Sequence, residues 1–185
     1  LSGTCFTNIS FALTQEEMDT EYEKSEEAKK NENWVLAKEF VTPLAENGHA
    51  KSQNRLGAIY LYGFGGVPKD LKKAFKWLKL SAEQGDPRGQ HILGVMYDKG
   101  QGVPQDYKEA VNWYRLSAEQ GFAHAQQCLA EMYYEGIGVP QDSIEAVKWW
   151  RLSAEQGYAK AQYNLGLMYA RGEGVPQDDK EAVRL

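Results

Sequence analysis

The string Ser81-Ala82-Glu83-Gln84-Gly85 (SAEQG) recurs unchanged at residues 117–121 and 153–157 of this 185-residue chain. Each copy therefore begins 36 residues after the one before, at positions 81, 117 and 153. A second string, Gly-Val-Pro, begins at positions 66, 102, 138 and 174 and keeps the same spacing. A fixed period of this length is typical of stacked-repeat arrays. The sequence therefore predicts a fold built from one repeated unit.

One copy of the unit, residues 86–121, has the pattern of a helical hairpin. Asp86, which a proline follows, is a typical start of a first helix, and Gly100 is suited to end that helix in the left-handed conformation. The Gly-Val-Pro connector cannot continue the helix because proline lacks an amide donor. Asp106 then caps a second helix, whose apolar residues recur at helical spacing until Gly121. SAEQG is thus predicted to be the last turn of the second helix together with its stop residue.

Equivalent positions of the copies form columns of identical residues. Aspartates occupy the predicted cap of the second helix, and aromatic residues occupy two further columns. The tryptophan column lies one helical turn from a column of alanines, so we expect it to share the apolar face and to fill the space between hairpins. We expect Trp150, which shares a column with Leu78 and Tyr114, to be packed as well. The columns are Asp70, Asp106, Asp142 and Asp178; Trp77, Trp113 and Trp149; and Tyr60, Tyr97, Tyr133 and Tyr169.

A degenerate unit precedes the regular copies. Its opening residues, Thr14-Gln15-Glu16-Glu17, have the pattern of a capping box at a helix start. Leu185 takes the place of a tryptophan of the column, so we expect the last hairpin to be cut short. The predicted organisation is a degenerate helical repeat at 14–48, repeats at 49–85, 86–121 and 122–157, and a truncated repeat at 158–185.

Residues 1–13 carry no charge and differ from all that follows. Ser10-Phe11-Ala12 has the small-x-small form of a signal-peptidase site, so we interpret this segment as the remnant of a signal peptide. The alternative is a disordered or helical leader of a cytoplasmic protein. Cys5 does not predict a lipid anchor, because the residues before it depart from the usual lipobox.

The motifs together resemble the Sel1-like repeat, a relative of the tetratricopeptide repeat with a longer connector between its helices. The match runs from about residue 33 to the C-terminus, through LG-x-x-Y, G-x-G-V-P-x-D and A-x-x-W-x-x-x-S-A-E-Q-G. The resemblance implies an all-α fold, a right-handed α/α solenoid superhelix with the first helices on its concave side. It also implies protein–protein interaction, a periplasmic or secreted location in a Gram-negative bacterium, and a role at the envelope or in contact with a host. In some relatives a disulfide bond stabilises each hairpin, but this chain lacks those cysteine pairs.

Composition and charge exclude several classes of protein. With 42% hydrophobic and 25% charged residues the chain has the composition of an ordinary soluble domain. A formal charge of -5 and a pI near 5.3 argue against a nucleic-acid interface, which needs clustered Lys and Arg. No apolar run approaches the roughly 18 residues of a membrane span. Two cysteines are too few for a disulfide framework.

No pattern predicts catalysis, a cofactor or a metal centre. The recurring G-x-G-V-P-x-D resembles a phosphate-binding loop, but no strand precedes it and it occurs in every unit, so a turn with a helix cap is favoured. His49, His91 and His124 lack the spacing of metal ligands, although the last two could approach each other from neighbouring first helices. Cys128 is interpreted as a structural thiol. We therefore expect a non-enzymatic protein without cofactor, metal, membrane insertion or nucleic-acid partner.

Comparison of the copies with one another divides each first helix into two halves. Positions that stay alike, such as Ser52, Leu56 and Ile59, are those that stacking requires. Positions that change fall on the opposite half, which we interpret as a groove for a protein or peptide partner. The alternatives are a solvated surface that is free to vary and a cell-wall- or glycan-binding, or envelope-hydrolase-related, module. The predicted binding residues are Lys51, Asn54, Arg55, Ala58, Arg88, His91, Ile92, Val95, Lys99, His124, Gln127, Glu131, Glu135, Lys160, Tyr163, Leu167 and Arg171.

Three basic residues of this set share one column. Lys51, Arg88 and Lys160 are predicted to form the upper rim of the groove. We expect them to attract an acidic side chain or a C-terminal carboxylate of the partner through charge-assisted hydrogen bonds.

Overall fold

The computed structural model describes residues 13–184, in which helices alternate with short connectors. This part contains ten α-helices, one short 3-10 helix and no strand, which confirms the predicted all-α fold. The helices are α1 (Gln15–Lys30), α2 (Trp34–Glu46), α3 (Ala50–Tyr62), η1 (Phe64–Gly66), α4 (Leu71–Glu83), α5 (Pro87–Lys99), α6 (Tyr107–Glu119), α7 (Ala123–Glu135), α8 (Ser143–Glu155), α9 (Ala159–Arg171) and α10 (Asp179–Arg184).

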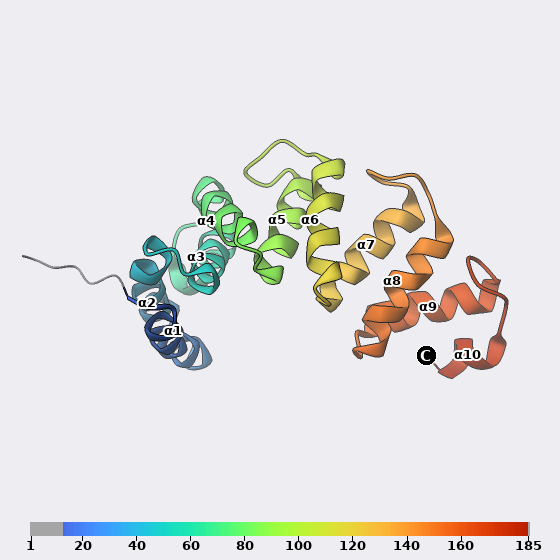
Figure 1. Cartoon of the computed structure of the whole chain (residues 1–185), viewed down its shortest axis with the longest axis horizontal. Helices are drawn as coiled ribbons and strands as arrows, with labels where there is room; N and C mark the ends of the chain where they lie inside the picture. Colours follow the sequence, from blue (N-terminus) through green and yellow to red (C-terminus); the bar gives the residue numbers. More distant parts are fainter. Residues whose placement is uncertain (1–12, 185) are drawn as a thin grey trace, which may run out of the picture.

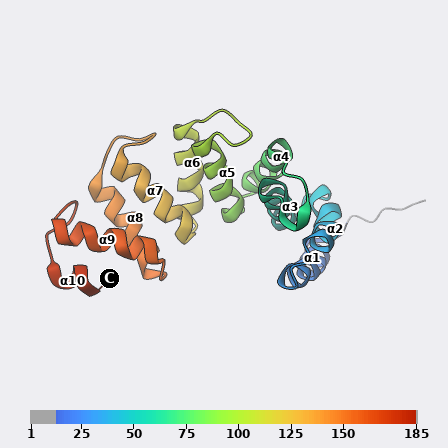
Figure 2. The same ribbon diagram turned by 180° about the vertical axis from the view of Figure 1, so that it is seen from behind.

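The helices pair in chain order into hairpins, and the hairpins stack. α1 packs on α2, α3 on α4, α5 on α6, α7 on α8 and α9 on α10, and the second helix of each hairpin also packs on the first helix of the next. Figure 1 shows the array as an arc, with the connectors α5–α6 and α7–α8 on its outer edge. The view from behind shows the same arc (Figure 2). The chain is therefore an α-solenoid, with α1, α3, α5, α7 and α9 as the first helices of successive hairpins.

Caps and glycine stops set the helix boundaries where the sequence predicted them. The carboxylates of Asp70, Asp106 and Asp142 accept hydrogen bonds from backbone N–H groups in the first turns of α4, α6 and α8. Thr14 and Glu17 form a reciprocal capping box at the start of α1. The helices α3, α5, α7 and α9 each end at a glycine in the left-handed conformation. A cap contributes roughly 1 kcal/mol to the stability of its helix. These local hydrogen bonds therefore largely determine where the helices of each hairpin begin and end.

The recurrence of SAEQG has an explanation in hydrogen bonds. In the second copy the buried serine closes the hairpin, because Ser117 Oγ donates to the Pro87 carbonyl oxygen in the first turn of α5, at 2.6 Å. The glutamine binds the first helix, because Gln120 Nε2 donates to Gln90 Oε1 at 2.7 Å. Gln90 Nε2 in turn donates to the Ala82 oxygen of the preceding hairpin at 3.3 Å. The string therefore clamps each hairpin and links it to its neighbour.

The other copies repeat these contacts. The equivalent donor–acceptor pairs are Ser81 with Ala50, Ser153 with Ala123, Gln84 with Gln53, and Gln156 with Gln126. The final glycine turns the chain into the next hairpin at φ 88° in Gly85, a value that other residues adopt only with strain. The glutamate is exposed in all three copies, and nothing in the structure explains its recurrence.

The tryptophan column is less buried than the sequence predicted, and the column beside it forms the centre of the core. Trp149 does pack against the cores of two successive hairpins, as expected. However, the whole tryptophan column is only partly buried. Successive side chains of a helix point roughly 100° apart. The residue after each tryptophan therefore points into the space between the first helix of its own hairpin and the first helix of the next hairpin. The residues of that buried column, with their exposed fractions, are Leu78 (0%), Tyr114 (1%) and Trp150 (2%).

The two ends of the array differ from its middle. The interpretation of residues 1–13 as a signal-peptide remnant, and with it Cys5, falls almost entirely on positions outside the described residues. At the other end α10 spans six residues, and Val183 is 88% exposed. None of the helices between residues 13 and 184 combines the length and the apolar character that crossing a bilayer requires.

Candidate functional site

The first helices have a stacking face, which is buried as the comparison of the copies predicted. Ser52, Leu56 and Ile59 are each 0% exposed. The equivalent positions in later repeats, such as Leu93 and Leu129, are also 0% exposed. The remaining half of each first helix carries the seventeen predicted binding residues, and we call it the variable face.

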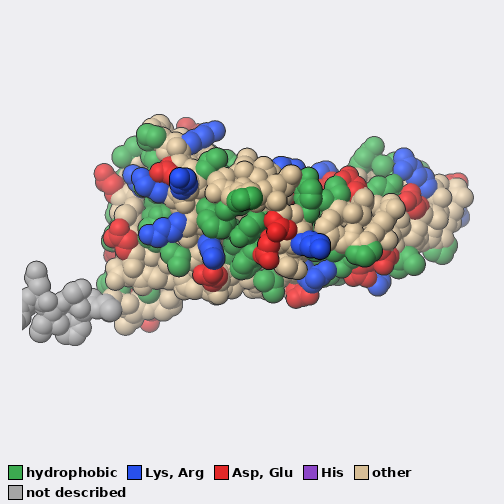
Figure 3. Space-filling model, turned by 90° about the horizontal axis from the view of Figure 1, so that it is seen from above, with side chains coloured by type: hydrophobic (Ala, Val, Ile, Leu, Met, Phe, Trp, Pro, Cys, Tyr) green, Lys and Arg blue, Asp and Glu red, His purple; other side chains and the backbone are tan. Residues whose placement is uncertain are grey.

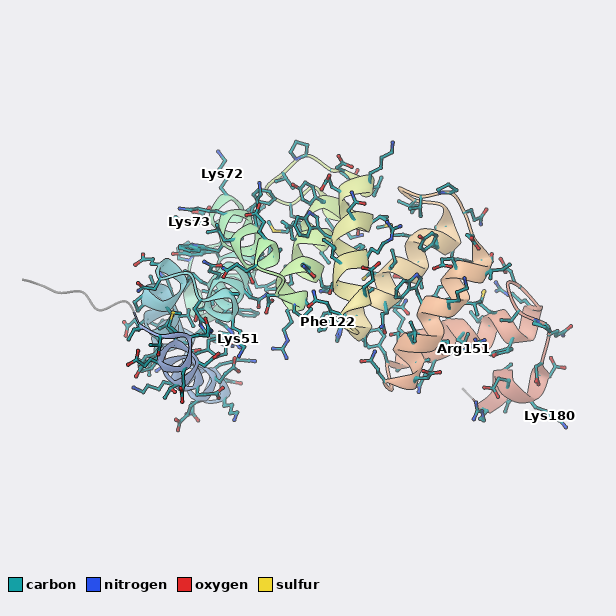
Figure 4. The ribbon with its side chains drawn as sticks, in the orientation of Figure 1. Lys51, Lys72, Lys73, Phe122, Arg151 and Lys180 are labelled. Carbon is teal, nitrogen blue, oxygen red and sulfur yellow. The ribbon has the colours of Figure 1, made fainter. Side chains whose placement is uncertain are left out.

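The N-terminal ends of the first helices lie on the inner side of the arc. In Figure 4, Lys51 at the start of α3 and Phe122 just before α7 lie on the underside of the arc, whereas Lys72 and Lys73 of the second helix α4 lie on its outer side. Figure 3 looks down on the outer side of the arc, where the connectors lie, and shows basic, acidic and apolar side chains interspersed there. The exposed members of the variable face are Lys51, Arg88, Lys99, His124, Glu135, Lys160, Tyr163 and Arg171.

The half-buried members lie between these exposed ones. They are Asn54, Ala58, His91, Ile92, Val95, Glu131 and Leu167. A ligand on the variable face would therefore meet long polar side chains at the surface and a partly apolar floor beneath them.

Arg55 and Gln127 are buried, so these two predicted binding residues do not reach the groove. Arg55 is 7% exposed; it forms an ion pair with Glu26 and donates to the Tyr22 hydroxyl at 3.0 Å. Gln127 is 2% exposed, and neither atom of its amide has a hydrogen-bond partner among the described residues. Arg55 is thus a structural residue that fixes α1 to α3. Comparison of the copies missed this role because its partners lie in the degenerate unit.

Ion pairs neutralise much of the charge on the variable face. Lys51 Nζ lies 2.8 Å from Asp19 on α1, and this contact lowers the pKa of the Asp19 carboxyl to about 2. Lys160 Nζ lies 2.7 Å from a Glu131 oxygen, and so joins α9 to α7. Two of the three basic residues of the predicted rim are therefore already paired, and only Arg88 has no carboxylate partner among residues 13–184.

Charge pairing continues along the next column. Lys99 Nζ lies 2.9 Å from the neighbouring Asp98 carboxylate. Glu135 and Arg171, at the equivalent positions of the next two repeats, form no ion pair within the described part of the chain. The charges of the variable face that remain for a ligand are thus Arg88, Glu135 and Arg171.

Three hollows follow one another along the variable face. The first hollow, of about 490 Å³, lies between α1, α3 and the start of α5, where Arg88 lines it. The middle hollow, of about 290 Å³, lies between α5, α6 and α7, and the last hollow, of about 140 Å³, lies between α7, α8 and α9. Glu131 and Glu135 of α7 line both the middle and the last hollow. The variable face is therefore indented at the junctions between repeats.

A cluster of aromatic rings lies at the starts of α7 and α9, against His91 of α5. The His124 ring lies between Phe122, at a centroid distance of 5.2 Å, and Tyr158, at 4.7 Å. The His91 ring beneath them lies 5.4 Å from Phe122 and 5.9 Å from His124. Phe122 and Tyr158 occupy N-cap positions but make no side-chain cap. An apolar residue at an N-cap lacks the roughly 1 kcal/mol of helix stability that a side-chain cap contributes. At these two positions ring packing is present in place of the cap.

The two histidines come together, as the sequence indicated, but their chemistry differs. Burial and the nearby His124 lower the pKa of His91 to about 4, so the His91 ring is neutral near pH 7. Cys128 Sγ lies 3.8 Å from His91 Nε2. Burial and the Glu131 carboxylate raise the pKa of the Cys128 thiol to about 12, which keeps it protonated and unreactive. Within residues 13–184 no cluster of three or more His, Cys, Asp or Glu side chains is arranged to hold a metal ion.

Sequence reasoning missed several residues that shape the variable face. Asp19 and Glu26 of α1, and Tyr114 of the core column, contact or line it from other elements. One signal was present in the sequence, because the pairs Glu26–Arg55 and Glu131–Lys160 are each 29 residues apart. A recurring separation between opposite charges, somewhat shorter than the repeat, marks neighbouring first helices in contact.

Comparison with known proteins agrees with this architecture. The family model described as Sel1 repeat matches residues 50–86, 87–122, 123–158 and 159–185. A solved Sel1 repeat protein from Oxalobacter formigenes is 31% identical with a TM-score of 0.81, covering 92% of this chain and 69% of that one. The protective antigen c5321, present in uropathogenic Escherichia coli strains, is 44% identical with a TM-score of 0.76 over 80% of this chain.

These relatives also differ from the chain in length. The chain spans 31% of the Escherichia coli antigen. A component of an ERAD-associated E3 ubiquitin-protein ligase from Arabidopsis thaliana, HRD3A, is 32% identical over 56 residues, which are 30% of this chain and 8% of that protein.

Proposed function

The chain belongs to the Sel1 repeat family, and we propose that it is a non-enzymatic scaffold that holds an extended segment of a partner protein along the variable face. Sel1 repeat proteins are generally protein-interaction scaffolds, and the family is generally non-enzymatic. Solenoids use the extended curved surface that stacked repeats create for binding.

The observation that supports this proposal is the run of three hollows on the half of the first helices that stacking does not use. An extended segment laid across α3, α5, α7 and α9 would pass all three. Arg88 at the first hollow and Arg171 at the last are cations without a carboxylate partner among the described residues. An acidic side chain or a C-terminal carboxylate of the partner would form charge-assisted hydrogen bonds with Arg88.

The proposed location is the periplasm or the exterior of a bacterial cell, with the cytoplasm as the alternative. The signal-like residues 1–13 support export. So does the similarity to a protein described as a protective antigen of uropathogenic strains. Mass spectrometry of the mature N-terminus in fractionated cells tests this point: cleavage after Ala12 supports export, and an intact cytoplasmic chain rejects it.

The binding proposal can be tested with a phage-displayed peptide library and two charge reversals of the same kind. Peptides selected on the wild-type chain should lose roughly fivefold or more in affinity to Arg88→Glu. They should bind normally to Lys72→Glu, because Lys72 lies on the outer side of the arc. Tyr163→Ala should also weaken them, since the Tyr163 side chain is 66% exposed on the variable face. Equal loss in both charge reversals, or no loss at Arg88 and Tyr163, would refute the variable face as the binding surface.

A second candidate, binding of a cell-wall glycan, rests on the rings of Phe122, His124 and Tyr158. The apolar face of an aromatic ring is suited to packing against the C–H face of a sugar ring. A titration with soluble muropeptides, monitored through the NMR signals of these three rings, separates the two candidates. Saturable shifts would favour the glycan, and their absence together with peptide selection would favour the scaffold.

A further inference from the structure

Trp150 of α8 carries a buried hydrogen-bond donor that the fold does not use. The side chain is 2% exposed, and its Nε1–H has no acceptor among residues 13–184. An indole nitrogen can donate but cannot accept. Buried donors ordinarily have a partner, because an unmade hydrogen bond in the interior is costly. The Nε1–H of Trp150 therefore lacks an oxygen acceptor that a ligand could supply.

Trp150 also lines the last hollow of the variable face, between α7, α8 and α9. The Nε1–H groups of Trp113 and Trp149 likewise have no acceptor within the described part of the chain. Those two residues line none of the three hollows, however. Among the three tryptophans, only Trp150 thus combines an unpartnered donor with a space beside it.

The equivalent position is filled differently in each repeat. Leu78 has no polar atom in its side chain and belongs to an apolar cluster with Leu61. In the next repeat the Tyr114 hydroxyl has the Cys128 thiol as a hydrogen-bond neighbour. Trp150 stands in the third repeat, and there the donor is left without a partner in the described part of the chain. The unpartnered donor is therefore a property of this repeat and not of the fold as a whole.

The charges around the last hollow balance one another. Glu131 lines it and is bound by Lys160, whose Nζ lies 2.7 Å from a carboxylate oxygen. Glu135 and Arg171 also line it; both are exposed, and they carry opposite charges. A cationic group in the hollow would meet Arg171, and an anionic group would meet Glu135. At about 140 Å³ the hollow has room for the end of one side chain, and a neutral polar group suits it best.

We propose that the last hollow is a pocket for the primary amide of a glutamine or asparagine side chain in the bound partner segment. The amide oxygen would accept from Trp150 Nε1–H, and the amide NH₂ would donate to the Glu135 carboxylate. The methylene groups of that side chain would lie against Leu167 and Met168, which also line the hollow. Arg171 is exposed, so its side chain can turn aside as the amide enters. The inference rests on the proposed function, because it specifies what the scaffold recognises.

The experiment is an NMR titration that follows the indole Nε1–H signal of Trp150. The probes are the peptides acetyl-Gly-Gly-X-Gly-Gly-amide, with glutamine, asparagine, glutamate, lysine or norvaline at X. The glutamine and asparagine peptides should move the signal downfield in a saturable way, because a new hydrogen bond deshields the proton. The other three peptides lack the amide and should bind about fivefold more weakly, which is the effect of one lost hydrogen bond.

Two equal substitutions at adjacent residues locate the effect. Trp150→Phe should reduce glutamine-peptide affinity about fivefold, because phenylalanine keeps an aromatic ring and lacks the donor. Trp149→Phe removes an N–H group that is also unpartnered among residues 13–184 but lies outside the hollows, and it should leave the affinity unchanged. Circular dichroism and thermal melting establish that each variant is folded.

A third variant does not depend on the packing of the core. Glu135 is exposed, and Glu135→Ala should reduce glutamine-peptide affinity about threefold. The assignment would be overturned by a Trp150 signal that does not move, or by equal losses in the two tryptophan variants. Equal binding of the glutamine and norvaline peptides, or of the glutamine and glutamate peptides, would overturn it as well.

The outcomes separate this inference from the proposed function. If library-selected peptides depend on Arg88 and Tyr163 but not on Trp150, and glutamine and asparagine in them can be replaced freely, the pocket assignment fails and the scaffold stands. If glutamine peptides bind at Trp150 while the selected peptides ignore the variants at Arg88 and Tyr163, the scaffold proposal fails and the pocket stands.

Discussion

Replacing Gln90 by alanine is predicted to lower the free energy of unfolding by about 2 kcal/mol, through loss of one hydrogen bond to the preceding hairpin and one within its own hairpin. The side chain is 5% exposed. Its Nε2 donates to the Ala82 oxygen at 3.3 Å, and its Oε1 accepts from Gln120 Nε2 at 2.7 Å. A net contribution of about 1 kcal/mol for each bond gives the predicted total.

The chain contains a matched control in the last repeat. Gln162 occupies the equivalent position in α9, is only half-buried, and among the described residues makes one longer bond, to the Ala154 oxygen at 3.4 Å. Gln162→Ala should therefore cost about 1 kcal/mol or less. The same chemical change is thus predicted to have at least twice the effect in the middle of the array.

Urea unfolding followed by far-ultraviolet circular dichroism measures both costs. In a repeat array the stability is approximately a sum of repeat and interface contributions, so a weakened central interface should also lower the cooperativity and with it the m-value. Hydrogen exchange should show faster opening at the junction of α4 and α5. If Gln90→Ala costs no more than Gln162→Ala, or leaves the m-value unchanged, the glutamine ladder does not couple the hairpins and our reading of SAEQG is wrong.

Three further predictions concern the core and the variable face. Gly94→Ala should destabilise by about 1 kcal/mol, because the added Cβ would lie 2.7 Å from ring atoms of Tyr114; overpacking costs about 1–3 kcal/mol and the gain in helix propensity returns about 1. A more stable variant in thermal unfolding would contradict this. Stability should fall as the pH is lowered from 6.5 toward 4, because His91 has a native pKa of about 4 and the unfolded chain takes up its proton first; His91→Gln should remove this part of the pH profile. Cys128 should react slowly with Ellman's reagent in the native protein and rapidly in denaturant, because burial raises its pKa to about 12; fast native labelling would show that the thiol is open to solvent.

The sequence by itself determined the hairpin unit and its stacking. Asp106 and Gly100 act on backbone groups a few residues away, so their effect can be read without knowledge of the rest of the chain. The period of SAEQG then required that successive units be alike, and the invariant half of the first helix identified the buried stacking face. These inferences succeeded because caps, stops and helical periodicity are local.

Only the tertiary structure decided which residues of the variable face are available to a ligand. Arg55 is buried by an ion pair with Glu26, 29 residues earlier, and Lys160 is bound to Glu131 across the same separation. Such contacts depend on how far each hairpin is rotated and shifted against the next, and that stagger arises from the packing of whole side chains such as Tyr114 and Trp150. The same packing determines the middle hollow. It lies between α5, α6 and α7, so a change in the size of the side chains at this junction alters the space between all three helices.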